Sequence, residues 1–261
     1  MLTATRSDTG LTDEERIRLA RDGYLLRPGA FSPGECAKLA NACELAVSTV
    51  LGETRRLKVQ SGGYVQEYRP RLHTLVKWEP HLPALIQGIE PCSHLSRVIA
   101  AFGADERLVA PCRAIADHDD LAPFTEKLNL KRAVRGGSFA LHQDYPYWAP
   151  VSKAADRIAT AMVCIDNCTR ESGCLEVAPG SHLEGVRKCK TGTGGGDFEM
   201  DPRAFDRSRM KPLEAVAGSV IFFGAFLVHR SAPNRSSRDR RALLYSYQPA
   251  GNKHLRDVLR G

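Results

Sequence analysis

One stretch decides the fold: Ser138-Phe139-Ala140-Leu141-His142-Gln143-Asp144-Tyr145. Phe139 and Leu141 alternate with small or polar neighbours, which is the two-residue period of a half-buried strand. His142 and Asp144 come at the end of this strand, and residues i and i+2 of an extended chain point to the same side. We therefore expect an imidazole and a carboxylate to meet at one point in space.

A second histidine extends this pair to a candidate metal site. The apolar run 222–228 ends in His229. Two imidazoles and one carboxylate on one face, with other positions open, are the ligand set of non-haem Fe(II) sites that activate dioxygen. A His-x-Asp spacing also arises by chance, and paired strand histidines are often structural. Further motifs are needed to decide between these interpretations.

The basic residues after His229 offer a partner for a carboxylate. Arg238, Arg240 and Arg241 lie just before the strand-like run 242–247. An arginine at the start of that strand can point into the same cavity as His229 and hold the far carboxylate of a dicarboxylic cosubstrate by two hydrogen bonds. The competing interpretation is an ordinary salt bridge, since three arginines are candidates.

Composition indicates one folded domain over residues 1–261. The chain is 43% hydrophobic and 26% charged, which fits an ordinary core. It has no run of about 18 apolar residues, so no membrane partner is expected. The net charge of +7 is spread along the chain without a polybasic block. We interpret this charge as solvated surface and do not expect nucleic acid as a partner.

The cysteine pattern favours a reducing compartment. None of the eight cysteines forms a CxxC pair, and residues 1–8 lack the apolar segment of a secretory signal, so a cytoplasmic location is expected. Cys164, Cys168 and Cys174 are close in sequence, but the usual zinc spacings are missing. We interpret them as small buried hydrophobes.

The N-terminal part predicts helices. Residues 1–10 are expected to form a tail, and 11–104 a mostly helical layer. Thr12 and Glu15 have the spacing of a helix-capping box, as do Ser32 and Glu35 at the start of a second helix. Residues 52–75 are expected to form a loop with some strand, and 82–103 two short helical stretches broken at Pro91.

From residue 105 the pattern changes to short β-like runs, which predicts a core over 105–250. The expected strands are 107–110, 126–130, 139–142, 158–165, 174–177, 220–223, 227–229 and 242–247, with a brief piece at Val216. Helices followed by such strands predict a mainly β fold with flanking helices, a double-stranded β-helix of the jelly-roll, cupin-like kind. The polar stretch 183–212, with glycine-rich residues 191–196, is expected to be a lid-like insertion.

Several motifs, in this order and spacing, resemble the phytanoyl-CoA dioxygenase (PhyH) family of Fe(II)/2-oxoglutarate oxygenases. They are spread over most of the chain, at residues 22–24, 31–36, 128–131, 142–148, 171–182, 217–223 and 229–236. The resemblance implies that the ligand interpretation holds for His142, Asp144 and His229, which match the iron ligands of the family.

The resemblance also implies binding residues for 2-oxoglutarate. Arg240, eleven residues after His229, matches the arginine that binds this cosubstrate, and Ser231 matches a hydroxyl on the same carboxylate. Lys131 and Asn129 fall in the strand that lines the cosubstrate pocket, which is a looser match.

Residues near the metal ligands are candidates for substrate contact. Tyr147 and Trp148 border the site in sequence, and each has plain packing as the alternative. Gln143 is expected to point away from the iron if the strand is regular, although it is kept as a candidate for the substrate side. The family usually has glycine after the distal histidine, and here Arg230 stands there.

The implied activity is hydroxylation of an unactivated C–H bond in a small molecule, with decarboxylation of 2-oxoglutarate to succinate and CO2. Iron, 2-oxoglutarate and O2 are the implied cofactors, with ascorbate as reductant in vitro. Asp144 argues against halogenation, because related halogenases have a small residue at that position. The alternatives are desaturation or ring formation in natural-product (secondary) metabolism, action on nucleic acid or protein, and a non-catalytic jelly-roll binding protein. The oligomeric state, monomer or homodimer, stays open.

Overall fold

A computed structural model of the chain describes residues 10–55, 57–61, 64–80, 82–189, 198–201, 203 and 205–260. The predicted tail lies outside these residues except for Gly10, as does the glycine-rich segment 191–196 of the predicted insertion. In this described part, no helix combines the length and the apolar character that crossing a membrane requires.

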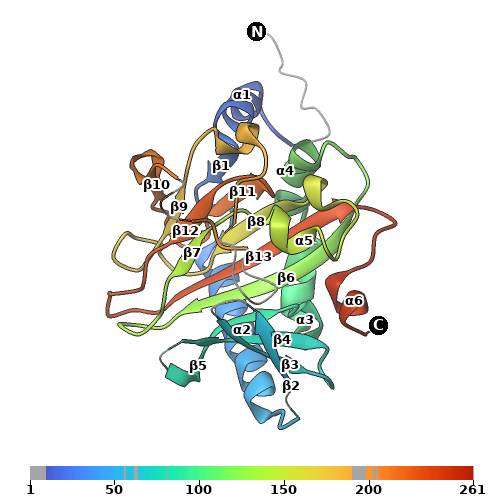
Figure 1. The fold of residues 1–261 in the computed structure, drawn as a ribbon, viewed down its shortest axis with the longest axis vertical. Helices are drawn as coiled ribbons and strands as arrows, with labels where there is room; N and C mark the ends of the chain where they lie inside the picture. The colour runs from blue at the N-terminus through green and yellow to red at the C-terminus, as the bar shows by residue number, and fades with distance from the viewer. Residues whose placement is uncertain are drawn as a thin grey trace.

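Two β-sheets form the centre of the molecule (Figure 1). The nine-stranded sheet has the order β1-β11-β8-β13-β6-β5-β4-β3-β2, and its neighbouring strands pair antiparallel. Its strands are β1 (Tyr24–Arg27), β2 (Leu57–Ser61), β3 (Tyr64–Arg69), β4 (Thr74–Glu79), β5 (Leu82–Glu90), β6 (Leu121–Lys131), β8 (Ala159–Cys164), β11 (Val220–Gly224) and β13 (Arg240–Pro249). The four-stranded sheet has the order β10-β9-β12-β7, with β7 (Phe139–His142), β9 (Leu175–Val177), β10 (Lys211–Leu213) and β12 (His229–Ser231).

Helices flank the larger sheet. They are α1 (Asp13–Asp22), α2 (Pro33–Gly52), α3 (Arg97–Gly103), α4 (Glu106–Ala116), α5 (Tyr145–Trp148) and α6 (Leu255–Arg260), with short 3-10 turns η1 (Ser93–Leu95), η2 (Ala155–Arg157), η3 (Ser181–Glu184) and η4 (Arg207–Arg209). Both capping boxes are present, because Thr12 and Ser32 each accept a hydrogen bond from the backbone N–H three residues later.

The core has two layers on either side of the nine-stranded sheet. Leu128 of β6 and Leu243 of β13 face the helices and pack in one cluster with Leu39 of α2 and Ile99 of α3. Their neighbours in sequence face the smaller sheet, as the two-residue period of a strand requires. Cys164, Cys168 and Cys174 are buried in this second layer, in agreement with their interpretation as small hydrophobes.

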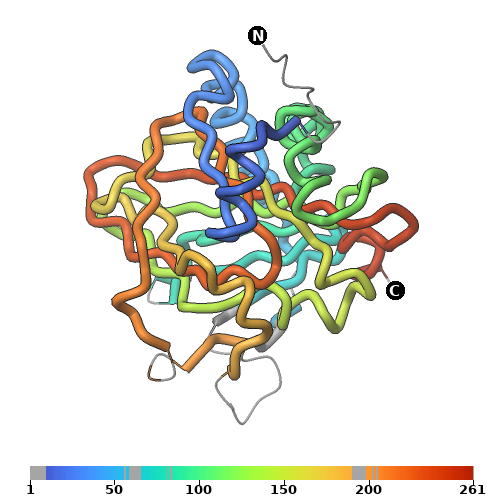
Figure 2. Tube along the Cα trace, turned by 90° about the horizontal axis from the view of Figure 1, so that it is seen from above, coloured from blue at the N-terminus to red at the C-terminus, as the bar shows by residue number. Residues whose placement is uncertain are grey.

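The longest pairing joins β6 and β13 from Arg240–Lys131 at one end to Pro249–Leu121 at the other. Seen from above, the red end of β13 lies beside the green start of β6 (Figure 2). Side chains from one face of this long antiparallel pair line the cavity of the candidate site. The two packed sheets confirm the predicted jelly roll with flanking helices.

The prediction of a mostly helical layer over 11–104 was wrong for its second half. Residues 57–90 contain the four strands β2 to β5, which extend the larger sheet. In β4, Val76 is fully buried against the helices and its neighbours Leu75 and Lys77 are only half-buried, so the alternation there is that of a strand. The stretch after Pro91 is helical as predicted, in η1 and α3.

The predicted strand 107–110 is part of helix α4 instead, so the boundary at 105 does not separate helices from strands. The Asp105 side chain accepts a hydrogen bond from Arg107 N and caps this helix. Leu108, Cys112 and Ala116, each four residues apart, are buried. This is a helical stripe that a four-residue window cannot distinguish from a strand. The brief strand near Val216 lies at 211–213.

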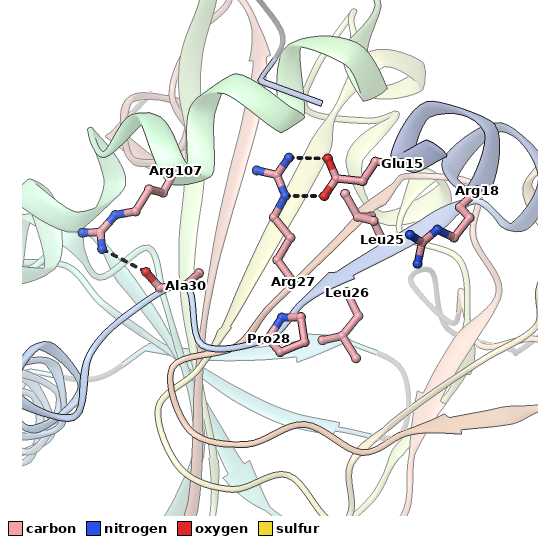
Figure 3. A pocket seen from close by; sticks show the side chains of 8 residues that line it. All are labelled: Glu15, Arg18, Leu25, Leu26, Arg27, Pro28, Ala30 and Arg107. Carbon is pink, nitrogen blue, oxygen red and sulfur yellow. Dashed lines mark hydrogen bonds and ion pairs between the residues drawn. The ribbon is translucent and has the colours of Figure 1, made fainter. Parts of the chain in front are cut away.

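A surface cavity of about 440 Å³ lies between α1, β1 and α4, away from the predicted site residues. Figure 3 shows its wall, where Arg27 of β1 forms two hydrogen bonds with Glu15 of α1 and Arg107 of α4 donates to the Ala30 carbonyl. These contacts fasten the first helix and strand to α4. Arg27 and Arg107 therefore have a structural role here.

Candidate metal centre

His142 and His229 lie next to each other on adjacent strands of the smaller sheet. They are register partners on β7 and β12, and their ring centroids lie 4.2 Å apart. Antiparallel pairing brings them together although 87 positions separate them in the sequence (229 − 142). His229 is 5% exposed, and its Nε2 lies at the edge of a cavity between the two sheets.

Asp144 joins the two histidines through a turn. Its Oδ1 lies 3.5 Å from His142 Nε2 and 3.9 Å from His229 Nε2. Strand β7 ends at His142, and Asp144 has helical φ and ψ of −75° and −30° as the residue that starts α5. The sequence argument found the right pair, but the bend into α5 rather than continued strand alternation brings the carboxylate to the imidazoles.

Both imidazoles are oriented by the backbone. His142 Nδ1 lies 2.7 Å from the Ala140 carbonyl oxygen, and His229 Nδ1 lies 2.9 Å from the Leu227 carbonyl oxygen. A carbonyl only accepts hydrogen bonds, so each Nδ1 carries the proton and donates it. The lone pair of each Nε2 is then directed towards Asp144, as in metal-binding histidines whose second nitrogen is held in this way.

The charge states suit a divalent cation. Burial, followed by the neighbouring His142, lowers the pKa of His229 to about 4, so this ring is neutral at pH 7. Burial raises the pKa of Asp144, but His229 and His142 outweigh this effect and hold the pKa below its ordinary value.

The three ligand atoms lie within 4.8 Å of one another. Among the residues that the structure describes, no other group of three His, Cys, Asp or Glu brings its ligand atoms so close. Two imidazole nitrogens and a carboxylate oxygen are a donor set that fits Fe(II).

The triad lines a cavity of about 310 Å³ between the sheets. Arg240, Ser231 and Asn129 line the same cavity, as do Tyr147 and Trp148. The Tyr147 ring packs edge-on against His142 at 5.7 Å, and Trp148 packs edge-on against Phe124 at 5.6 Å. The structure therefore brings together eight of the ten residues singled out from the sequence, namely these five and the triad.

Of the three arginines considered from the sequence, Arg240 is the one that lines the cavity. Its side chain is 2% exposed, and Nη2 donates a hydrogen bond of 2.6 Å to the Gly173 carbonyl. Its Nε is buried and has no hydrogen-bond partner in the described part of the chain. A buried donor without an acceptor is costly, so the site fits a ligand that supplies one, such as a carboxylate.

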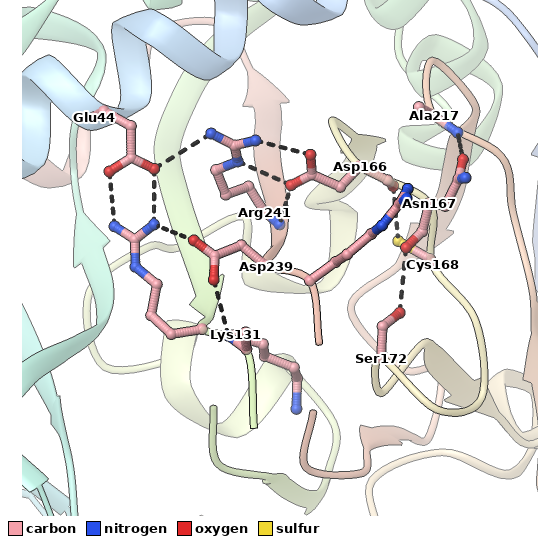
Figure 4. A network of polar contacts seen from close by, with 12 residues as sticks. Glu44, Lys131, Asp166, Asn167, Cys168, Ser172, Ala217, Asp239 and Arg241 are labelled. Atoms are coloured by element: carbon pink, nitrogen blue, oxygen red, sulfur yellow. Dashed lines mark hydrogen bonds and ion pairs between the residues drawn. The ribbon is translucent and has the colours of Figure 1, made fainter. Parts of the chain in front are cut away.

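The two competing arginines have other positions. Arg238 is exposed. Arg241 donates to Asp166 through Nε and Nη2 and lies 3.3 Å from Glu44 of α2, in the network that Figure 4 shows. Arg132 adds ion pairs to Glu44 and Asp239. This network fixes the start of β13 and thereby the position of Arg240.

Lys131 lies next to Arg240 but does not line the cavity. Its Nζ donates to the carbonyl oxygens of Gly137 and Ala232. Burial, followed by the charge of Arg240, lowers the pKa of Lys131 to about 6. An uncharged amine has two N–H groups, which match these two carbonyls. The geometry gives Lys131 a role in joining three segments around Arg240, in place of the predicted contact with the cosubstrate.

Gln143, predicted as a candidate for substrate contact, does not line the cavity either. Its Nε2 donates to the carbonyls of Gly185 and Phe226, and its Oε1 accepts from Arg187 N. The side chain is 1% exposed and points away from the triad. Gln143 therefore fastens the start of the predicted insertion 183–212 to the turn before His229.

Further on, the insertion itself touches the cavity. The Phe198 ring packs edge-on against Tyr147 at 5.1 Å and lines the cavity.

Arg230, the departure from the family pattern, forms an ion pair of 2.8 Å with Glu176, its register partner on β9. Arg230 lines the cavity as well, and its guanidinium is paired there with Glu176 of the neighbouring strand.

Sequence reasoning missed the residues that the larger sheet contributes. Lys77 of β4, Glu90 of β5 and Lys127 of β6 line the cavity, with Gln66 of β3 beside them. Three of these strands had been interpreted as loop or helix, so their alternation was not used. The signal was present, since Val76 and Trp78 alternate with Leu75 and Lys77.

Comparisons with known proteins agree with this geometry. A sequence profile of the phytanoyl-CoA dioxygenase (PhyH) family matches residues 19–242. The chain is 25% identical to a methylphosphonate hydroxylase of Gimesia maris over 257 residues, covering 96% of this chain and 85% of the relative. It is 25% identical to an L-proline trans-4-hydroxylase of Streptomyces griseoviridis, covering 92% of this chain and 87% of the relative.

Solved structures share the fold. EctD from S. alaskensis, solved with 2-oxoglutarate and 5-hydroxyectoine, superposes with a TM-score of 0.71 at 21% identity over 94% of this chain and 78% of that one. SnoK, an alpha-ketoglutarate-dependent carbocyclase from nogalamycin biosynthesis, superposes with a TM-score of 0.69 at 18% identity over 94% and 87%. The profile match spans most of the chain, which therefore belongs to the phytanoyl-CoA dioxygenase (PhyH) family and is an enzyme of the iron- and 2-oxoglutarate-dependent oxygenase class.

Proposed function

We propose that the chain hydroxylates an unactivated C–H bond of a small molecule, using Fe(II), 2-oxoglutarate and O2. The observation that carries this proposal is the common cavity of the ligand triad and the buried Arg240 Nε. A metal site alone fits many reactions. A buried guanidinium with an open donor beside that site favours a cosubstrate with a second carboxylate.

Each residue has a separate task in this proposal. His142, Asp144 and His229 hold the iron, and Arg240 with Ser231 holds the far carboxylate of 2-oxoglutarate. Bound iron with 2-oxoglutarate supplies oxidation by O2, coupled to decarboxylation to succinate and CO2. Tyr147 and the rest of the cavity wall exclude water and orient the substrate. Asn129 is proposed to contact the cosubstrate, since its buried Oδ1 has no hydrogen-bond partner in the described chain.

The residue at position 144 favours oxygen insertion over halogenation. A carboxylate ligand occupies the coordination position that a halide needs. Desaturation or ring formation in natural-product metabolism is the alternative outcome, since both begin with oxidation of the same kind of C–H bond. The product separates these reactions, because hydroxylation adds one oxygen atom and the other two remove two hydrogen atoms.

Size and surroundings support a small-molecule substrate rather than nucleic acid or protein. The cavity of about 310 Å³ is at the lower end for ligand pockets. The relatives named above act on methylphosphonate and L-proline, which are both small and polar.

We also propose a cytoplasmic location, because no disulfide joins the eight cysteines and seven of them are buried.

The experiment is release of succinate from 2-oxoglutarate with Fe(II), O2 and ascorbate, over a panel of small carboxylates, phosphonates and amino acids. We expect succinate release that depends on both iron and substrate, together with a product that contains one more oxygen atom. A purified protein that binds neither iron nor 2-oxoglutarate would refute the proposed function.

A further inference from the structure

A cationic wall lies on the β4–β6 side of the metal cavity. Lys77 of β4 pairs in register with Gly88 of β5, and Gly88 pairs with Asn129 of β6. Lys127 lies two residues before Asn129 on the same face of β6. Lys77, Asn129 and Lys127 all line the cavity that holds the triad. Two lysine side chains thus lie on one sheet face within the cavity.

Gly88 makes room between these side chains. The structure gives it no positive φ, and a Cβ at this position would meet Leu128 O at 3.4 Å, Asn129 Oδ1 at 3.6 Å and Lys77 Cβ at 3.8 Å. These are ordinary contact distances, so neither the backbone nor a close approach requires glycine here. Gly88 adds no side chain to this face, so the space beside Lys77 Cβ and Asn129 Oδ1 is not filled from β5.

The electrostatics of the wall favour an anion. Burial, followed by the charge of Lys127, holds the pKa of Lys77 well below its ordinary value, although Glu199, Glu79 and Glu90 act in the opposite direction. A negative group against Lys77 would stabilise the protonated amine. Lys127 lies 3.3 Å from Glu90, so an incoming anion competes with Glu90 for this ammonium.

The cosubstrate does not account for these lysines. Arg240 lies on β13 opposite Lys131, four residues beyond Lys127 on β6, and it has its own open donor. The metal ligands lie on the smaller sheet. The wall at Lys77 and Lys127 is therefore available to the second reactant, the substrate.

We propose that the substrate carries an anionic group, a carboxylate or a phosphonate, which binds Lys77 and Lys127 over Gly88. This inference rests on the proposed function and adds the chemical class of the substrate. The lysines act as specificity determinants, because they hold the molecule at its charged end while its C–H bond lies at the triad. The aromatic residues Tyr147, Trp148 and Phe198 line other parts of the cavity and fit its apolar part.

Binding tests this proposal without turnover. Protein is loaded with Mn(II), which does not support the oxidation, and with saturating 2-oxoglutarate, so that Arg240 is occupied. Two matched pairs of probes are titrated: butanoate against butanamide, and propylphosphonate against its diethyl ester. We expect the anions to bind about tenfold more tightly than the neutral partners, since a charge-assisted hydrogen bond is about twice as strong as a neutral one.

Substitutions test whether Lys77 and Lys127 cause the preference for anionic over neutral probes. Lys77→Met and Lys127→Met should each weaken anion binding by about tenfold and leave the neutral probes unchanged. Glu90→Gln should instead strengthen anion binding, because it removes the competing carboxylate. Gly88→Leu should weaken both classes of probe by filling the space. The control is Lys153→Met, at an exposed lysine outside the cavity, with no effect on either class.

The inference is overturned by an absence of anion binding, by equal binding of anionic and neutral probes, or by anion binding that does not respond to Lys77→Met or Lys127→Met. Weakened binding of 2-oxoglutarate in these variants, with butanoate binding unchanged, would assign the lysines to the cosubstrate and also overturn it. Failure of the proposed function is distinct, since Mn(II) and 2-oxoglutarate themselves would then not bind.

Discussion

Arg240 and Arg241 are adjacent on β13 but point to opposite faces of the nine-stranded sheet. Arg240 lines the metal cavity, whereas Arg241 pairs with Asp166 and with Glu44 of helix α2. Alternation along the strand separates a ligand-binding guanidinium from a structural one. The two residues thus form a matched pair for experiments.

Replacing Arg240 by Met should weaken binding of 2-oxoglutarate by roughly 10- to 100-fold, since a hydrogen bond to a charged group contributes about 1.5–3 kcal/mol. Titration of the cosubstrate against metal-loaded protein measures this loss. Arg241→Met should lower the free energy of unfolding and weaken that affinity much less, because Arg241 positions the strand and does not line the cavity. An equal loss of affinity in both variants would contradict the assignment of Arg240.

Replacing Asp144 by Ala should reduce iron affinity and activity by about 100-fold or more, because loss of even an outer-shell partner of a metal ligand costs about 10- to 100-fold. Metal analysis after gel filtration and succinate release measure the two effects. Asp257→Ala is the control, since this carboxylate is exposed and pairs with Arg260 on α6, away from the triad. Full iron content in Asp144→Ala would mean that Asp144 is not a ligand.

Lys131 should make stability depend on pH. Its pKa is about 6 in the folded protein, whereas the ordinary value of 10.5 applies in the unfolded chain. Between these two pH values the unfolded chain therefore holds a proton that the folded chain lacks. Stability therefore rises with pH across this window and is lowest below about pH 6, with a contribution of order 1 kcal/mol per pH unit.

Urea unfolding of wild type and Lys131→Met, at about pH 6.5 and about pH 8.5, measures this contribution. Wild type should gain more stability than the variant over this interval, by about 2 kcal/mol. Parallel changes in the two proteins would show that Lys131 stays protonated between the Gly137 and Ala232 carbonyls.

Replacing Gln143 by Leu should loosen the segment that begins the insertion. The change leaves the Gly185 and Phe226 carbonyls and the Arg187 N–H without their partner, at a cost of about 1–3 kcal/mol for a buried group. Limited proteolysis should cut faster within residues 183–189, while iron content stays near that of wild type. Unchanged proteolysis with an altered substrate preference would restore the sequence-based interpretation of Gln143.

The metal ligands were predictable because their chemistry is carried by residue type and short spacing. Even there the sequence argument used the wrong local geometry, since Asp144 reaches the histidines through the first turn of α5. Gln143 lies between two ligands and was placed near the substrate on that basis. Its amide instead bonds three backbone groups that are distant in sequence, and proximity in sequence carries no information on such contacts.

The sequence by itself determined the ligand triad, the jelly-roll class, the capped helices and the three arginines among which the cosubstrate residue lies. Only the tertiary structure decided that Arg240 lines the metal cavity and Arg241 does not, because the register of β13 against β6 sets which face each side chain takes. It alone brought Lys77 and Lys127 to the metal cavity. Antiparallel pairing joins strands through backbone hydrogen bonds that every residue type provides, so the sequence of one strand does not reveal which strand lies beside it.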